Sequence, residues 1–384
     1  MNKINNFGIA VILFTSTLTI MVGTAIAPSL TEIAKNLNFS YSPGWLITLP
    51  SLGVVVFASS VGKLIDRIGT FKLLCLGLIP YAIFGFLGGF ITNTYLLILD
   101  RFLLGPAAVA IQVALITYIA DYFKGKERMK LIAWQGMSIE LGGVVFLSLG
   151  GVLGDWNWRY PFAIYLVAFV CLVFVFLFLP KDDKSKIDDN QKADLNIAET
   201  PKQKKEVQLI VWGSLLAMAL FFVSFVRLPQ YLPTVFDFSD SQVGYFMASI
   251  SLVAVLSASQ MPRVTDKLNS YNTVISGFAF FVLGYVCFAL ASSMFLLIAG
   301  ILCIGVGFGF TIPLLNHMIV EASTIKTQGK NLGLSSMGIF AGQFLSTFIE
   351  FVSDDTRLIF GVASGLALVI ALIFFFAFKK VRLM

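Results

Sequence analysis

The chain has 384 residues, of which 58% are hydrophobic and only 12% are charged. A soluble domain usually carries about a quarter charged residues, so this composition excludes an ordinary soluble domain. The net charge of +6 suggests a nucleic-acid partner only until the positions of the cations are considered. The four cysteines lie inside apolar runs without metal-site spacing, so we interpret them as small buried hydrophobic residues and expect no metal.

Twelve apolar runs are long enough to cross a membrane, since a bilayer core needs about 20 mostly apolar residues per helix. The first six lie near 7–29, 42–64, 71–92, 95–120, 131–154 and 160–180. The second six lie near 207–235, 243–263, 273–293, 296–320, 332–352 and 357–378. The sequence therefore predicts an all-α membrane protein with twelve transmembrane helices, six in each half.

Between the two sets lies a polar segment, residues 181–206, with seven lysines and seven acids. It has no aromatic residue and too few aliphatic residues to bury a core. We expect a mobile cytoplasmic tether between an N-terminal bundle, 1–180, and a C-terminal bundle, 207–384.

The positions of lysine and arginine predict the orientation, because cytoplasmic loops carry an excess of these residues. With a cytoplasmic N-terminus, the inner segments hold 22 of the 27 cations, whereas the outer loops hold only Lys35, Arg159 and Arg357. We therefore expect a multi-pass protein of the cell (plasma) membrane with both termini in the cytoplasm. The same pattern assigns the basic charge to the membrane face, so no nucleic-acid partner is expected.

A polar loop between two apolar runs, Gly62–Gly69, recurs 200 positions later as Pro262–Asn269 in degraded form. The aspartates Asp66 and Asp266 keep their places, and a cation follows each of them. Further pairs at this offset are Gly44 and Gly244, Gly105 and Gly305, Asp121 and Glu321, and Gly142 and Gly342. Such a repeat predicts a transporter built from two similar halves related by an axis along the membrane normal.

Several motifs give the chain a resemblance to the major facilitator superfamily over essentially its whole length. The loop Gly62–Gly69 resembles the signature between helices 2 and 3 of that family, and Leu99–Gly105 resembles its fourth-helix arginine motif. Asn157–Phe162 resembles the entry to helix 6, and Ile26–Leu30 resembles the end of helix 1 in the twelve-helix drug:proton antiporter branch. The resemblance implies two pseudo-symmetric six-helix bundles and transport by alternating access.

The fifth span departs from the pattern of the export-type members. Those members usually carry a central Gly-Pro, whereas this chain has Phe146 and Leu147 between the flanking glycines of Gly142–Gly151. The departure weakens the assignment to antiport but leaves the superfamily resemblance intact.

The repeated loop suggests a conformational latch composed of Gly62, Asp66, Arg67 and Asp266. Gly62 would allow two helices to approach closely. The resemblance implies that Asp66 meets the start of helix 11, where the helix dipole favours a negative charge, and closes the cytoplasmic side. A static brace is the alternative, but weak surface pairs suit a contact that must break.

Glu140 is the strongest candidate for proton coupling. It lies about nine residues into the fifth span, roughly 14 Å from the inner face and close to the midplane of the bilayer. A carboxylate there is costly unless it is protonated, paired or facing a cavity. We expect Glu140 to carry the coupling proton or to attract a cationic substrate, with permanent structural pairing as the alternative. Arg101 could reach Glu140 or Asp100, and the resemblance implies that this arginine assists proton transfer.

Polar groups in the middle of spans are candidates for lining a substrate cavity, although each could instead link helices by a hydrogen bond. The candidates are Thr17, Thr19, Gln112, Gln135, Tyr231, Asn316 and Gln343. Arg227, near the outer end of the seventh span, is interpreted as snorkelling to the surface, with attraction of an anion as the alternative.

Together these observations favour a secondary active transporter: a proton-coupled exporter of small amphipathic or cationic compounds. The alternative is an importer or uniporter for a sugar, an amino acid or an organic anion. The sequence has no cluster of nucleophiles or metal ligands for an intramembrane enzyme and no soluble domain for a sensor. The expected partners are a small-molecule substrate, protons and the lipid bilayer. We expect a monomer without a cofactor, in which the proton gradient supplies the energy.

Overall fold

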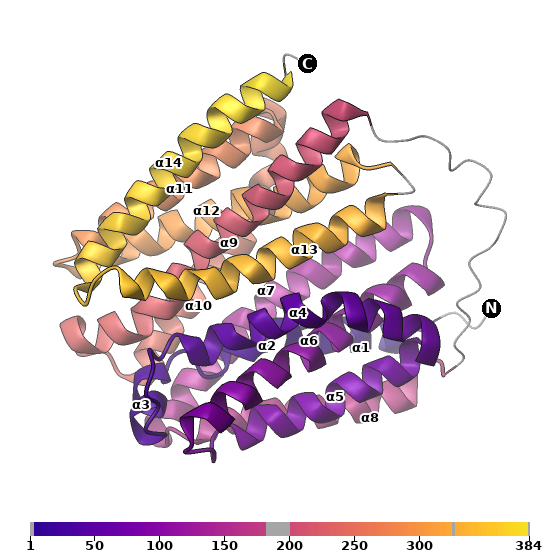
Figure 1. Cartoon of the computed structure of the whole chain (residues 1–384), viewed down its shortest axis with the longest axis horizontal. Coiled ribbons are helices and arrows are strands. Elements are labelled where there is room, and N and C mark those ends of the chain that lie inside the picture. The colour runs from indigo at the N-terminus through magenta and orange to yellow at the C-terminus, as the bar shows by residue number, and fades with distance from the viewer. Residues whose placement is uncertain (1–3, 182–199, 325–326, 383–384) are drawn as a thin grey trace. The chain divides into compact units, whose positions relative to one another are not determined.

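The computed structural model describes residues 4–181, 200–324 and 327–382, and all regular elements in these ranges are helices (Figure 1). Before the polar segment the helices are α1 (Asn6–Ser16), α2 (Leu18–Thr24), α3 (Leu30–Asn36), α4 (Trp45–Ile68), α5 (Thr70–Leu87), α6 (Thr94–Tyr122), α7 (Gly125–Trp156), η1 (Tyr160–Leu166) and α8 (Val167–Phe178). After it follow α9 (Pro201–Phe236), α10 (Asp240–Leu268), α11 (Ser270–Ala289), α12 (Met294–Ala322), α13 (Gln328–Leu345), η3 (Ser346–Phe351) and α14 (Thr356–Arg382).

Within the described residues, 12 helical segments are long and apolar enough to cross a membrane. They coincide with the twelve predicted runs and differ from them by a few residues at the ends. The predicted fold class, an all-α membrane protein with twelve spans, is confirmed.

The first span is not the single helix predicted over 7–29, because it breaks at Thr17 between α1 and α2. The Thr17 hydroxyl donates to the Phe14 carbonyl at 2.7 Å, and the Thr19 hydroxyl donates to the Ser16 carbonyl at 2.8 Å. Hydroxyls bonded to preceding carbonyls in this way compete with the regular helix ladder and bend it.

The polar segment ends earlier than predicted. Helix α9 begins at Pro201, whereas we expected an unfolded tether up to residue 206. The Thr200 hydroxyl accepts from the Gln203 amide nitrogen, and the Gln203 side chain accepts from the Thr200 amide nitrogen, which together form a capping box. Proline at the first helical position supports the same start. The remainder of the tether prediction, 182–199, lies outside the described residues.

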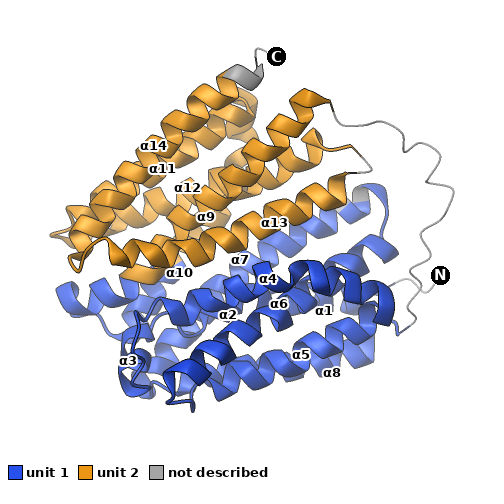
Figure 2. Ribbon diagram, viewed as in Figure 1, with its two compact units in different colours: residues 1–186, 228–248 blue, residues 187–227, 249–384 orange. Residues whose placement is uncertain are grey.

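Two compact units make up the chain (Figure 2). Unit 1 comprises residues 1–186 and 228–248, and unit 2 comprises 187–227 and 249–384. The end of α9 and the start of α10 therefore group with unit 1. The predicted bundles 1–180 and 207–384 rest on the sequence repeat and stay a prediction.

Inside each unit, glycines of the 200-residue repeat lie at equivalent helix contacts. A Cβ added to Gly105 of α6 would lie 2.2 Å from the Pro50 carbonyl of α4, and one added to Gly305 of α12 would lie 2.8 Å from the Ile250 carbonyl of α10. Only glycine allows the two helices of each pair to pack this closely. The repeat in the sequence is thus also a repeat of packing.

Candidate transport site

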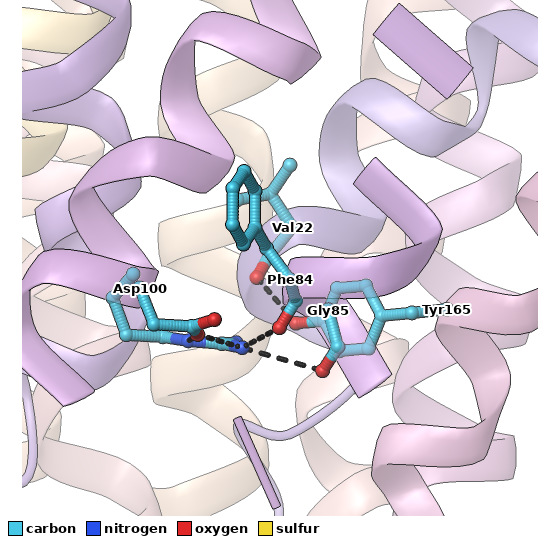
Figure 3. Close-up of polar contacts among 6 residues, drawn as sticks. Val22, Phe84, Gly85, Asp100 and Tyr165 are labelled. Carbon is cyan, nitrogen blue, oxygen red and sulfur yellow. Dashed lines mark hydrogen bonds and ion pairs between the residues drawn. The ribbon is translucent and has the colours of Figure 1, made fainter. Parts of the chain in front are cut away.

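The centre of unit 1 contains a buried ion pair on α6. Arg101 is fully buried and Asp100 is 6% exposed. The Arg101 Nε and Nη2 atoms both donate to Asp100 Oδ2, at 3.0 and 2.8 Å (Figure 3). Because arginine remains charged inside a protein, it must be paired to be tolerated there. Of the two predicted partners, Asp100 and Glu140, the structure shows Asp100.

The rest of the Arg101 environment comes from other helices. Its Nη2 atom also donates to the α5 carbonyls of Phe84, at 2.7 Å, and Gly85, at 3.2 Å. The guanidinium carbon lies 5.6 Å from the centres of the Phe162 and Tyr165 rings, within cation–π range. The entry motif of the sixth span therefore supplies part of the site, since Phe162 is its last residue.

A glycine provides the space that this guanidinium occupies. A Cβ added to Gly88 would lie only 2.0 Å from Arg101 Nη2 and 2.6 Å from its guanidinium carbon. Any larger side chain at this position would displace the cation from Asp100. The sequence analysis did not single out Gly88, because its contact with Arg101 joins two helices.

Two tyrosines connect this cluster to the first span. The Tyr165 hydroxyl donates to the Val22 carbonyl at 2.7 Å (Figure 3). The Tyr81 hydroxyl donates to the Leu18 carbonyl at 2.5 Å, and its ring lies 5.9 Å from that of Tyr165. Helix α2 is thereby held against α5 and η1, the two elements that contact Arg101. Neither tyrosine was predicted as a site residue.

Glu140 on α7 has a different environment from the ion pair. Its Oε2 atom is buried, and among the described residues it has no hydrogen-bond partner. Nearby contacts fix α7 against the first span: Gln135 donates to the Ser16 hydroxyl at 2.9 Å, and a Cβ added to Gly142 would lie 2.7 Å from Thr17 Cβ. Residues 135 and 142 share one face of α7, whereas Glu140 lies off that face. The helix is thus anchored beside a carboxylate that lacks a partner.

The other cavity candidates have varied environments. Gln135 links two spans, which is the alternative we considered, whereas the hydroxyls of Thr17 and Thr19 donate to carbonyls of their own span. Gln112 is half-buried and Asn316 is exposed, and neither forms a hydrogen bond with a described residue.

Two further cavity candidates are buried, Tyr231 at 2% exposed and Gln343 at 9%. Whether any of the candidates binds substrate stays a prediction.

The expected snorkelling of Arg227 is wrong. Arg227 is 8% exposed, and its Nη1 atom lies 3.3 Å from Glu350 Oε1 in the same unit. Its Nη2 atom also donates to the Thr356 hydroxyl at the start of α14. Glu350, an internal acid that was not among the predicted site residues, is the partner of this cation.

The latch residues lie at the end of α4 and in the corresponding part of α10. A Cβ added to Gly62 would meet no described atom within 4 Å, so the close helix approach expected there is not observed. Asp66 and Arg67 are exposed and form no hydrogen bond or ion pair with a described residue. Asp66 belongs to unit 1, whereas Asp266 and α13 belong to unit 2, so the latch stays a prediction.

Comparison with known proteins decides the family. Residues 12–347 match the Major Facilitator Superfamily. The chain belongs to this superfamily. It is 26% identical to multidrug resistance protein 2 of Bacillus subtilis (strain 168) over 240 residues, which cover 61% of this chain and 58% of that protein. It is also 26% identical to the class B tetracycline resistance protein of Escherichia coli over 300 residues, 76% of this chain and 73% of that protein.

A solved structure agrees with the family assignment. The bacterial homolog of the human lysosomal transporter Spinster, inward-facing and unoccupied, matches with a TM-score of 0.80 at 13% identity and covers 97% of both chains. At this identity the likeness shows the fold. The family match and the 12 candidate spans together make the protein a multi-pass membrane transporter of the Major Facilitator Superfamily.

Proposed function

We propose that this transporter exports small amphipathic or cationic compounds from the cell in exchange for protons. It would act as a monomer in the plasma membrane, with both termini in the cytoplasm, and would draw its energy from the proton gradient. The names of the multidrug and tetracycline resistance relatives support export as the direction. The latch at Asp66 would open and close the cytoplasmic side in each cycle.

The observation that carries the proposal is the unpartnered carboxylate of Glu140. Its Oε2 atom is buried within a membrane-spanning helix and has no hydrogen-bond partner among the described residues. An ionised carboxylate in this environment is costly, whereas a protonated one is tolerated. Glu140 would therefore take up a proton when its surroundings are closed and release it when they are wet.

Asp100 and Arg101 would assist this proton transfer rather than carry the proton. Asp100 is already paired with Arg101 through two hydrogen bonds, so its partner is a fixed cation. The pair also fixes α6 against α5 and, through Tyr165, against α2. The site would thereby keep its shape while Glu140 changes its charge.

The test is transport by purified protein reconstituted into vesicles with an imposed pH gradient. We use ethidium as a cationic amphipathic probe and tetracycline as a second probe. We expect wild-type protein to accumulate either probe on the acidic side of the membrane. Glu140→Gln keeps the size of the side chain but cannot release a proton, so it should lose accumulation driven by the gradient.

The matched control is Glu127→Gln, which changes an exposed acid in the first turn of the same helix. This variant should transport as the wild type does. Full proton-driven accumulation in Glu140→Gln would contradict the role of Glu140. Transport of both probes at the same rate with and without the gradient would contradict proton coupling altogether.

A second candidate function is supported by the altered motif in the fifth span. Phe146 is 5% exposed and Leu147 is fully buried on α7, in place of the Gly-Pro of typical exporters. An importer or uniporter of a sugar, an amino acid or an organic anion would not require that motif. Uptake of such solutes in the same vesicles, with no movement of ethidium, would favour this alternative.

A further inference from the structure

A groove on the surface of unit 1 shares one residue, Phe84, with the surroundings of Arg101. It lies between α4, α5 and α6 and has a volume of about 480 Å³. Every residue on its wall except Ser60 is apolar or aromatic. Leu64 is 37% exposed and Leu76 is 56% exposed, so the groove opens outward from these helices. On a membrane-spanning protein, such an apolar surface is suited to contact with the hydrocarbon of the bilayer.

The length of the groove matches one leaflet of the membrane. On α5 its wall extends from Leu73 to Phe84. The 11 residue steps between them cover about 16 Å at a rise of 1.5 Å per residue. This is roughly half of a hydrocarbon core about 30 Å thick. The groove is therefore as long as one acyl chain of a single leaflet.

Exposed cations surround the end of the groove near the loop between α4 and α5. Arg67 follows the groove residue Leu64 by three positions, and Lys72 precedes the groove residue Leu76 by four. Residues three or four apart share a helix face, so both cations lie on the side of the groove. Lys63 adjoins Leu64 in the same turn. The side chains of all three cations are exposed.

These cations are available to bind an outside partner. Neither Lys63, Arg67 nor Lys72 forms an ion pair with a described residue. Asp66 is the acid of the same loop, so three cations and one acid leave a net charge of +2 beside the groove. The excess of lysine and arginine predicts that this end faces the cytoplasm, where the leaflet carries anionic lipids. The net positive charge and the expected cytoplasmic position both indicate an anionic lipid as the ligand.

We propose that unit 1 binds an anionic phospholipid of the cytoplasmic leaflet. One acyl chain occupies the groove between α4, α5 and α6, and the headgroup phosphate lies among Lys63, Arg67 and Lys72. A neutral lipid fills the same groove with lower affinity, because it lacks the net negative charge. The bound lipid would sit directly beside the proposed latch loop.

The test measures lipid binding to the purified full-length protein by native mass spectrometry. Dioleoyl-phosphatidylglycerol and dioleoyl-phosphatidylcholine are titrated separately in mild detergent. We expect the anionic lipid to bind at least about fivefold more tightly, since each cation near the surface contributes about fivefold. Leu76→Trp, which fills the groove, should weaken binding of both lipids. The triple variant Lys63→Gln, Arg67→Gln, Lys72→Gln should abolish the preference and retain the binding of the neutral lipid.

Matched controls come from unit 2. Leu283→Trp changes a leucine on α11 that is 53% exposed and is not part of the groove. Arg263→Gln with Lys267→Gln removes both cations of the repeated loop on α10. Both controls should bind the two lipids as the wild type does.

Equal binding of the two lipids by the wild type would overturn the proposal, as would unchanged preference in the triple variant. Undiminished binding in Leu76→Trp would also overturn it, because the groove would then not hold the chain. Each readout is binding, so it does not depend on the proposed transport activity.

Discussion

In unit 1, α6 carries Asp100 and Arg101 inside the membrane-spanning region, whereas 200 positions later α12 carries Gly300 and Ile301. The side chains around these two positions also differ between the units. Arg101 occupies the space beside Gly88, but a Cβ added to Gly300 would meet the ring of Phe288 at 2.3 Å. Unit 1 has an ion pair beside Gly88 at this place, whereas unit 2 has the ring of Phe288 packed against Gly300.

The same contrast holds for Glu140, whose counterpart 200 positions later is Phe340. The helix contacts, however, are common to both units. The Tyr81 hydroxyl donates to the Leu18 carbonyl in unit 1, and the Tyr285 hydroxyl donates to the Leu220 carbonyl in unit 2. Unit 2 folds on this scaffold without counterparts of these three charges, and its own buried pair, Arg227 and Glu350, lies at other positions of the repeat. We infer that Asp100, Arg101 and Glu140 are retained for transport rather than for the fold.

The largest expected effect comes from Arg101→Ala. It leaves Asp100 buried without its cation, and breaking a buried pair typically costs about 3–5 kcal/mol. We expect complete loss of ethidium transport, measured in reconstituted vesicles with the amount of inserted protein determined by gel.

A second variant separates transport from stability. Asp100→Asn with Arg101→Met removes both charges and keeps similar side-chain volumes, which is often neutral for stability. It should insert and unfold like the wild type, yet transport nothing. Wild-type transport by this double variant would show that the ion pair serves the fold alone.

A smaller effect on transport is expected at the ion pair of unit 2. Glu350→Gln leaves Arg227 buried with a reduced interaction, so the thermal midpoint of unfolding in detergent should fall by several degrees. Transport should continue at a reduced rate, because this pair is not part of the proposed proton-coupling site. Arg227→Gln with Glu350→Gln should recover part of the midpoint. Lost transport with an unchanged midpoint would instead place the pair in the transport cycle.

The smallest effect is expected for the tyrosines shared by the two units. Tyr81→Phe removes the hydrogen bond to the Leu18 carbonyl, whereas Tyr285→Phe removes the bonds to the Leu220 carbonyl and the Ser224 hydroxyl. Interhelical hydrogen bonds in membranes average about 0.6 kcal/mol, so each variant should shift the unfolding midpoint only slightly, with the larger shift for Tyr285→Phe. Chemical denaturation in detergent measures both shifts. A much larger loss for one tyrosine would indicate that the two scaffolds are not equivalent.

Sequence reasoning predicted well what depends on local pattern. The twelve spans follow from hydropathy, and Asp100, the neighbour of Arg101 in the sequence, was one of the two partners expected for it. The start of α9 was also readable, because Thr200, Pro201 and Gln203 form a capping signal that we did not use.

Contacts between distant helices were not predictable in this way. Arg227 was expected to snorkel because its partner, Glu350, is 123 positions away and carries no local signal. Gly88 and Tyr165 contact Arg101 from other helices, and a single sequence does not show which faces of two helices meet.

The break of the first span at Thr17 is a local feature that we did not predict. It depends on hydroxyls that bond to preceding carbonyls of the same span.

The most direct test of the account is proton movement caused by substrate. Purified protein is reconstituted into vesicles that contain a pH-sensitive dye, and ethidium is added to the outside without an imposed pH gradient. The account predicts that ethidium transport drives protons in the opposite direction in wild-type protein and in Glu127→Gln. Glu140→Gln should show no pH change. An equal pH change in Glu140→Gln would contradict the claim that Glu140 couples protons to transport.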